Sequence, residues 1–355
     1  MKRCHFIGMD THRQFCTVAV VNSKGDIVQR ERCATSIPGL LAIIETVPRP
    51  RWLVIEEGSL ANWLWRGLHD AVDKMVVCEP RRNRLISQEG DKDDDLDAAD
   101  LAELFRGGYV KPVHQVATLE RTLFKQQVAI HHYRVRQRVR EGLRVSSWFC
   151  QHGVMIRERA FTDAADRPAL VARLPPSPVL SALVVQLLSS YDAQVEQEEH
   201  WRQQLVKAAR QIEVVQRWVA LPGISWIRAA TLYAYLDTPW RFRSKSAAWK
   251  YMGIGLQRKR SGNGPEYLGV PKRAHRLLKG TILGAARSAA ASRNNPFADL
   301  YGRWIDQGLS AKLARRNVAR ALAATLLGMW KNGSAYRPEW VGVPAAAISA
   351  TEVSR

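Results

Sequence analysis

The chain has 355 residues, 46% of them hydrophobic, which is enough for two or three domains with packed cores. No run of about 18 apolar residues occurs, so we expect no membrane-spanning segment and no membrane partner. The start of the chain lacks the long apolar segment of a signal peptide, and the five cysteines form no C-x-x-C pair. This composition argues against a disulfide-framed secreted domain or a zinc ribbon, and it predicts a cytoplasmic protein.

The positive charge is concentrated in one third of the chain. Residues 1–115 hold 16 Lys and Arg against 17 Asp and Glu, and residues 116–215 hold 14 against 10. Residues 216–340 hold 22 against 5, a net charge of +17 out of a total of +20. A cationic block of this kind is typical of a protein with a polyanion partner, above all nucleic acid.

Residues 1–115 predict an α/β domain with a mixed sheet. Apolar runs bounded by turn residues indicate strands, and helical periodicity indicates the helices between them. The strands are expected at 4–10, 15–21, 27–33, 51–55 and 74–78, and the helices at 37–47, at 60–72 and from Leu96 onward. Three strands followed by alternating helices and strands are typical of an α/β fold.

An acidic run at 91–100 leads into the last of these helices. Five of its first seven residues are acidic, and their mutual repulsion has to be relieved by a cation or by solvent. Asp94 and Asp97 are three residues apart, on one face of the first helical turn. The dipole of a helix also favours carboxylates at its N-terminus. Both a solvated helix start and a pair of metal ligands therefore fit this run.

Two further carboxylates stand at the ends of predicted strands. Asp10 ends the first strand, and Glu56 or Glu57 follows the fourth; successive strand residues face opposite ways, so only one of the two glutamates points inward. This order of carboxylates is that of the ribonuclease H-like fold, in which they converge to hold two divalent metal ions. Asp10, Glu56, Asp94 and Asp97 would supply four ligands for two-metal phosphoryl transfer.

Residues 116–218 predict a helical arm. One long helix is expected at 119–150 and a second at about 180–219, joined by a Pro-rich connector at 163–179. Heptad spacing in the second helix predicts an antiparallel coiled coil, with an ordinary helical bundle as the alternative. Either phosphate contact or a solvated surface accounts for the arginines that crowd the first helix. These are Arg134, Arg136, Arg138, Arg140 and Arg144.

Residues 219–340 predict a basic, mostly helical domain, and 341–355 a tail. Residues 221–225 lead into a helix expected at 227–236, as in helix hairpins that hold a DNA phosphate on backbone N–H groups. The stretch 255–264 places Ser261 after three cations and before a Gly-Asn-Gly loop. Ser261 could attack a phosphodiester while the cations stabilise the transition state. Spacing alone favours the other interpretation, a basic loop that grips a backbone phosphate.

Together these motifs resemble the DEDD transposases of one bacterial insertion-sequence group, the bridge-RNA-guided recombinases. The resemblance covers most of the chain. In the N-terminal part it is carried by Gly8-Met9-Asp10, Ile55-Glu56-Glu57-Gly58, Cys78-Glu79-Pro80 and Lys92-Asp93-Asp94-Asp95-Leu96-Asp97-Ala98, which follows the pattern K-x-D-x-x-D-A. In the C-terminal part it is carried by Leu221-Pro222-Gly223-Ile224, Arg241-Phe242-Arg243-Ser244, Tyr251-Met252-Gly253-Ile254 and Ser261-Gly262. Glu56-Glu57-Gly58-Ser59 departs from the commoner E-A-T-G pattern, which leaves the choice of glutamate open by one residue.

The resemblance implies a RuvC-like domain of the ribonuclease H fold at 1–115, a coiled-coil arm at 116–218 and a transposase domain at 219–340. It implies that Asp10, Glu56, Asp94 and Asp97 bind Mg²⁺, about two ions per site. It also implies that Ser261 is the nucleophile and forms a 5′-phosphoserine-type intermediate. The basic residues expected to contact nucleic acid are Arg258, Lys259, Arg260, Lys272, Arg273 and Arg276.

The activity implied is the excision and insertion of a mobile DNA element under the guidance of a structured non-coding RNA. Donor DNA, target DNA and that RNA are then the expected partners, and the protein is expected at the bacterial nucleoid. The family's active site joins the carboxylates of one subunit to the serine of another, which implies dimers that pair into a tetramer. Two alternatives are a RuvC-like nuclease or junction resolvase that uses metal-activated water, and an RNA-binding scaffold with a vestigial carboxylate set.

Overall fold

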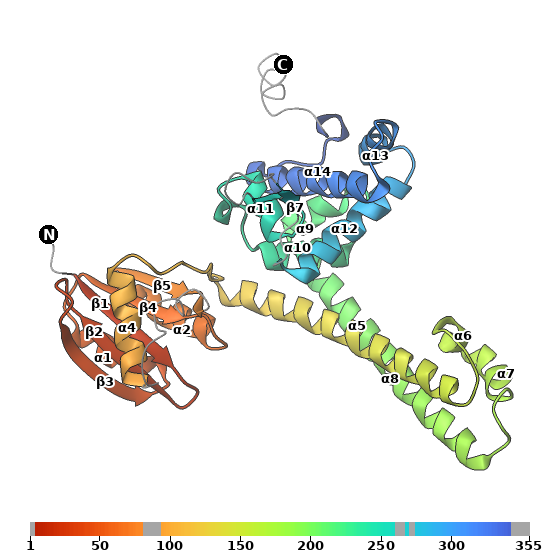
Figure 1. Ribbon diagram of the computed structural model, residues 1–355, viewed down its shortest axis with the longest axis horizontal. Coiled ribbons are helices and arrows are strands. Elements are labelled where there is room, and N and C mark those ends of the chain that lie inside the picture. The colour runs from red at the N-terminus through yellow and green to blue at the C-terminus, as the bar shows by residue number, and fades with distance from the viewer. Residues whose placement is uncertain (1–3, 81–93, 260–266, 270–273, 342–355) are drawn as a thin grey trace. The chain divides into compact units, whose positions relative to one another are not determined.

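The computed structural model describes residues 4–80, 94–259, 267–269 and 274–341 (Figure 1). The chain divides into two compact units, residues 1–119 and residues 120–355. The further division of the second unit into an arm and a transposase domain stays a prediction. Within the described ranges, no helix combines the length and the apolar character needed to cross a bilayer.

A five-stranded mixed sheet forms the centre of the first unit, as the sequence predicts. Its order is β3-β2-β1-β4-β5; β1, β4 and β5 are parallel, and β2 is antiparallel to both of its neighbours. The strands are β1 (His5–Thr11), β2 (Phe15–Val21), β3 (Ile27–Ala34), β4 (Arg51–Glu56) and β5 (Lys74–Cys78). The arrangement is consistent with a ribonuclease H-like DEDD domain.

Helices cover both faces of this sheet. Alternate residues of the strands pack against α1 and α2 on one face, where Ile7, Leu53 and Leu64 share a buried cluster. The residues between them pack against α4 on the other face, where Val54 and Phe105 lie in a second cluster. The helices of this unit are α1 (Ile37–Thr46), α2 (Ala61–Leu68), the 3-10 turn η1 (His69–Ala71) and α4 (Asp94–Arg106).

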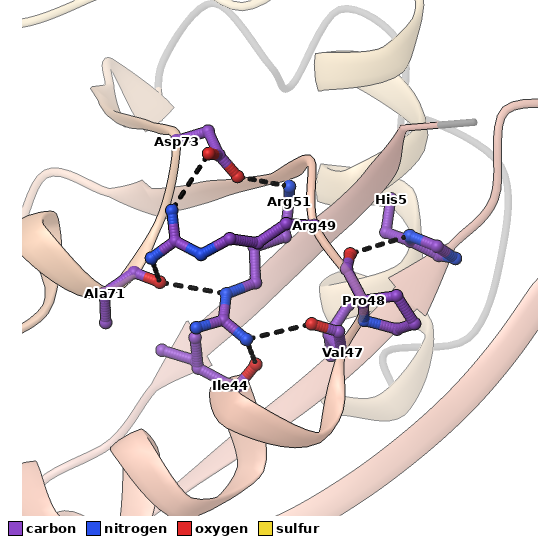
Figure 2. Close-up of polar contacts among 8 residues, drawn as sticks. All are labelled: His5, Ile44, Val47, Pro48, Arg49, Arg51, Ala71 and Asp73. Carbon is purple, nitrogen blue, oxygen red and sulfur yellow. Dashed lines mark hydrogen bonds and ion pairs between the residues drawn. The ribbon is translucent and has the colours of Figure 1, made fainter. Parts of the chain in front are cut away.

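A buried arginine connects the end of α1 to the start of β4, as Figure 2 shows. Arg51 is 7% exposed, and its Nη1 donates to the carbonyl oxygens of Ile44 at 2.6 Å and Val47 at 2.9 Å. Its Nε donates to the carbonyl oxygen of Ala71 at 2.9 Å. These carbonyls lie at the C-terminal ends of α1 and η1, where acceptors have hydrogen-bonding capacity that the helix does not use, and the guanidinium fills it in place of water.

Close packing of α4 on β1 depends on Gly8. A Cβ atom at this position would lie 2.0 Å from the carbonyl oxygen of Ala98 and 2.6 Å from the backbone nitrogen of Ala102. Both atoms belong to the backbone of α4 and cannot rotate away. The absence of a side chain at Gly8 therefore sets the distance between the helix and the strand.

Substitution of Gly8 by alanine is expected to push α4 off the sheet and to lower the free energy of unfolding by about 1–3 kcal/mol or more. Urea denaturation of the full chain, followed by circular dichroism, measures the change. Gly58→Ala is the matched control, because a Cβ at Gly58 meets nothing within 4 Å and its φ is not positive. Equal stability of the two variants would contradict this account of the packing.

The second unit is mostly helical, as predicted, and adds a small antiparallel hairpin. Its helices and strands are α5 (Leu119–Gln151), α6 (Arg159–Thr162), η2 (Ala164–Asp166), α7 (Arg167–Val171), α8 (Pro178–Ala209), α9 (Glu213–Val219), α10 (Trp226–Leu236), η3 (Pro239–Arg241), α11 (Lys245–Tyr251), β6 (Gln257–Lys259), β7 (Tyr267–Gly269), α12 (Arg276–Ala291), α13 (Pro296–Asp306), α14 (Ala311–Asn332) and η4 (Pro338–Trp340). One large cluster of buried side chains from α9, α10, α12 and α14 forms the core of its C-terminal part.

Three predictions for this unit need correction. The helix expected at 180–219 ends at Ala209, and α9 follows as a separate helix because Trp218 turns into the core, where its Nε1 donates to the carbonyl oxygen of Leu326 at 3.1 Å. The connector at 163–179 contains the short helices η2 and α7. The stretch expected to be a basic loop contains β6, paired with β7.

The glycine of the predicted DNA-binding hairpin has a packing role. Gly223 has φ +79°, and a Cβ there would lie 2.2 Å from the carbonyl oxygen of Ala285 on α12. The turn between α9 and α10 therefore needs glycine both for its backbone conformation and for its contact with α12. Phosphate binding at this hairpin stays a prediction.

The helices α5 and α8 contact each other through apolar side chains and charged pairs. Phe149 of α5 and Leu188 of α8 belong to one buried cluster. Arg138 of α5 donates to Glu198 of α8 at 2.7 Å and also pairs with Glu158. Of the arginines that crowd α5, this one is thus used within the fold. The coiled coil itself stays a prediction.

Of two adjacent histidines in α5, His131 is buried and His132 is partly buried. The hydroxyl of Thr231 donates to the carbonyl oxygen of Ile227 at 2.7 Å, so it accepts the hydrogen bond that links it to Nε2 of His132 at 2.8 Å. His132 therefore carries its proton on Nε2 in the neutral form. Burial, and then the neighbouring His131, lower the pKa of His132 to about 4. Burial also lowers the pKa of His131, against an opposing effect of Glu198.

The second unit is therefore expected to lose stability as the pH falls below about 6.5. The unfolded chain takes up protons on both histidines near that pH, whereas folded His132 resists protonation down to about pH 4. Their contribution is complete above the unfolded pKa and is lost toward the folded one. Denaturation midpoints at pH 7.5 and pH 5 measure it, with His132→Gln as the variant in which the pH slope is expected to flatten. An unchanged slope in that variant would contradict the assignment.

Candidate active site

Asp10 and Glu56 lie side by side at the carboxyl ends of two neighbouring parallel strands. The last paired residues of β1 and β4 are Met9 and Ile55, so the next residue of each strand is one of the two carboxylates. Gly8 and Val54, two residues earlier, both face α4. Because side chains alternate along a strand, Asp10 and Glu56 belong to this same face of the sheet.

The structure separates Glu56 from Glu57. Glu56 is the last residue of β4 and is partly buried, whereas Glu57 lies beyond the strand and is exposed. The backbone nitrogen of Glu57 donates to the carbonyl oxygen of Cys78 at 2.8 Å, which holds the chain at the point where it leaves the sheet. Of the two glutamates, Glu56 is the one on the face that carries Asp10.

The direction of α4 brings its first turn to the same end of the sheet. The ring of Phe6 on β1 lies 6.1 Å from the ring of Phe105 near the end of α4. Two residues further along β1, Gly8 packs against Ala98 and Ala102, so α4 runs antiparallel to β1. The next residue of β1 on this face is Asp10. One turn toward the start of α4 from Ala98 and Ala102 lies the first turn of the helix, which contains Asp97.

Asp97 is exposed, and the next residue, Ala98, is fully buried. Asp94 begins α4 three residues earlier, one helical turn back toward the acidic run. The backbone of Asp94 is described, and its side chain lies outside the described part of the structure. The register of α4 therefore places the start of this helix beside Asp10 without fixing the direction of the Asp94 carboxylate.

His12 and Thr17 surround Asp10, and sequence reasoning assigned neither of them a role. Nε2 of His12 lies 2.8 Å from Oδ2 of Asp10, and the His12 ring packs 4.6 Å from the ring of Phe15. Thr17 stands opposite Asp10 on β2 and is 2% exposed. Its hydroxyl has no hydrogen-bond partner within the described residues. The sequence signal for His12 was its position two residues after a strand-end aspartate.

The residues at this end of the sheet fit a divalent cation. Among the side chains that the structure describes, which exclude Asp94, no group of three His, Cys, Asp or Glu is close enough to bind a metal ion. Neighbouring carboxylates are nevertheless the ligands that Mg²⁺ prefers, and a buried hydroxyl without a partner opposite Asp10 marks a polar site that is incomplete without another group.

The other predicted residues lie in the second unit. Arg258 and Lys259 are in β6, opposite Leu268 and Tyr267 of β7, and their side chains are not described. Arg276 begins α12 and is exposed. Four positions lie outside the described residues, namely Arg260, Ser261, Lys272 and Arg273.

Comparison with known proteins assigns the family. Residues 7–152 match a family model for the DEDD transposases of IS110, described as transposase, and residues 216–302 match one described as transposase of the IS116/IS110/IS902 family. The chain belongs to the IS110 family of transposases. The first match of this IS110-family chain contains the strands and the helix that carry Asp10, Glu56 and Asp97. The second contains the hairpin β6–β7 and the stretch with Ser261.

One curated relative is the transposase for insertion sequence element IS1111A from Coxiella burnetii. It is 27% identical to this chain over 146 residues, which are 41% of this chain and 38% of the relative. The matched segment thus spans well under half of either protein. The similarity agrees with the assignment to the family.

Proposed function

We propose that this protein cuts and rejoins DNA as the transposase of an insertion sequence, with Asp10, Glu56, Asp94 and Asp97 as its metal ligands. One observation supports this above all others: the ends of β1 and β4 and the first turn of α4 meet at one end of one face of the sheet. The carboxylates at these places follow the order Asp, Glu, Asp, Asp along the chain.

The residues around Asp10 have distinct tasks in this proposal. Two Mg²⁺ ions bound to the four carboxylates would supply positive charge to the scissile phosphodiester. His12 holds one oxygen of Asp10 through its 2.8 Å contact and leaves the other oxygen available as a ligand. Thr17, opposite Asp10 on β2, offers a buried hydroxyl as a hydrogen-bonding group for a ligand at this end of the sheet.

Ser261 is the proposed nucleophile. Its Oγ attacks the phosphorus, a bond from serine oxygen to phosphorus forms, and the bond to the 3′ oxygen breaks. The 3′ hydroxyl leaves with the proton, and the 5′ phosphate stays on the serine. Rejoining reverses these steps with a different 3′ hydroxyl. The neighbouring Arg258, Lys259 and Arg260 would stabilise the extra negative charge of the phosphorane.

The proposed partners are donor DNA, target DNA and a structured guide RNA, and the proposed assembly is a tetramer of two dimers. Support for a nucleic-acid partner is the net charge of +17 on residues 216–340. If base pairing with RNA selects the DNA, the protein itself needs to recognise backbone and shape, and a cationic surface serves that purpose.

A covalent adduct tests the nucleophile. Wild type is expected to form a protein–DNA adduct that survives denaturing electrophoresis when incubated with Mg²⁺, guide RNA and donor DNA, and Ser261→Ala is expected to form none. Ser246→Ala, which changes an exposed serine of α11, is the matched control and is expected to form the adduct as wild type does. Cleavage by Ser261→Ala without an adduct would instead indicate attack by water, as in a RuvC-like nuclease.

A further inference from the structure

The turn between α10 and α11 holds a tryptophan in solvent. Trp240 is 72% exposed, although it lies in the 3-10 turn η3 between Pro239 and Phe242, which are both buried. Trp240 is therefore the part of this turn that the core leaves uncovered. Its exposed indole is an aromatic surface on which a planar ligand can stack.

The residue before this turn has a strained backbone, and hydrogen bonds to its side chain hold it in that conformation. Asp237, directly before it, has φ 63° and ψ −56°, a conformation that L-residues rarely adopt. Its carboxylate accepts hydrogen bonds from Nε of Arg121 at 3.1 Å and Nη2 at 3.0 Å. The guanidinium of Arg121 in turn packs 3.9 Å from the ring centre of Tyr233. The side chain of Thr238 caps the turn by accepting from the backbone nitrogen of Trp240 at 3.4 Å.

The charges around Trp240 are positive. Nζ of Lys331, in the last turn of α14, lies 5.3 Å from the centre of the Trp240 ring. Arg243 and Lys245 follow the turn and are exposed. The segments 238–251 and 311–335 together hold nine Lys and Arg and no Asp or Glu. The nearest carboxylate in the sequence, that of Asp237, is buried in its pair with Arg121.

We infer that Trp240 is a stacking platform for an unpaired nucleobase, with Lys331 and Arg243 placed to contact the adjoining phosphates. A flat aromatic face among cations suits single-stranded nucleic acid, because every base has a π face and every nucleotide a phosphate. A duplex offers no free base face and would use the cations alone. Binding of a base to Trp240 requires neither metal nor cleavage.

The test measures binding of full-length protein in EDTA to fluorescein-labelled dT12, to labelled U12 and to a 12-base-pair DNA hairpin by fluorescence anisotropy. Trp240→Ala is expected to weaken binding of one or both single strands by about 5- to 150-fold, the loss of one stacked base, and to change hairpin affinity less than about 2-fold. Loss for dT12 alone identifies DNA as the source of the base, loss for U12 alone identifies RNA, and loss for both shows that the site accepts either.

Two further variants separate stacking from damage to the fold. Trp240→Phe keeps an aromatic face and is expected to restore most of the single-strand affinity. Trp63→Ala removes a 38% exposed tryptophan from the first unit and is expected to bind as wild type does. Unchanged binding of both single strands by Trp240→Ala, or an equal loss for strands and hairpin at unchanged melting temperature, overturns the proposal. Because no DNA is cut, the result is independent of the proposed chemistry.

Discussion

Asp97→Asn is expected to lower DNA strand cleavage by at least about 10²-fold. The amide removes one negative ligand from the site whose metal ions would supply positive charge to the scissile phosphate. The substitution keeps the size of the side chain at an exposed position of α4, so the free energy of unfolding is expected to stay within about 0.5 kcal/mol of wild type. Single-turnover cleavage of donor DNA in Mg²⁺ measures the effect.

Asp100→Asn is the matched control for this experiment. Asp100 lies on the same helix, is also exposed and is three residues further from the end of β1 that carries Asp10. We expect it to cleave as wild type does. Equal losses in the two variants would mean that the helix acts through its overall charge, and the assignment of Asp97 as a ligand would then be wrong.

Arg51→Met is expected to have the largest effect on stability in the first unit, a loss of about 3 kcal/mol or more in the free energy of unfolding. The methionine fills the volume, but the carbonyl oxygens of Ile44, Val47 and Ala71 each lose a hydrogen bond to the buried guanidinium (Figure 2). Denaturation of the full chain, followed through the β-sheet signal of circular dichroism, measures the loss.

Arg49→Met serves as the comparison. Arg49 is half exposed, at 51%, and donates to Asp73 at 2.9 Å and to the carbonyl oxygen of Ala71 at 3.1 Å. Water can replace these bonds, so the midpoint is expected to move far less than in Arg51→Met. A shift as large as that of Arg51→Met would show that the hydrogen bonds of both arginines, and not the burial of one guanidinium, stabilise the start of β4.

Most of the first unit could be predicted because its signals are local. Each strand is an apolar run bounded by turn residues, and each observed strand lies within about two residues of its expected bounds. The run that ends in Glu56 and the run that ends in Asp10 are both of this kind. Their carboxylates could be named from the sequence because a polar residue at the end of a buried strand lies at the edge of the sheet.

The features that the sequence could not supply depend on tertiary contacts. The break between α8 and α9 falls inside a continuous apolar register, and it accompanies the burial of Val215 and Trp218 of α9 in the core of the C-terminal part. The close approach of Gly8 to α4, which aligns Asp97 with Asp10, involves residues about ninety positions apart. The contact of His12 with Asp10 depends on the direction of the imidazole ring, which residue spacing does not determine.

The most direct test of the carboxylate site is backbone cleavage by bound iron. Fe²⁺ that replaces Mg²⁺ generates hydroxyl radicals in the presence of ascorbate and peroxide, and these cut the chain next to the metal. Cuts are expected at three places together, near Asp10, near Glu56 and within 94–97, and all of them are expected to be suppressed by excess Mg²⁺ and by Asp10→Asn. Cuts confined to other parts of the chain, or cuts that Asp10→Asn leaves unchanged, would contradict it.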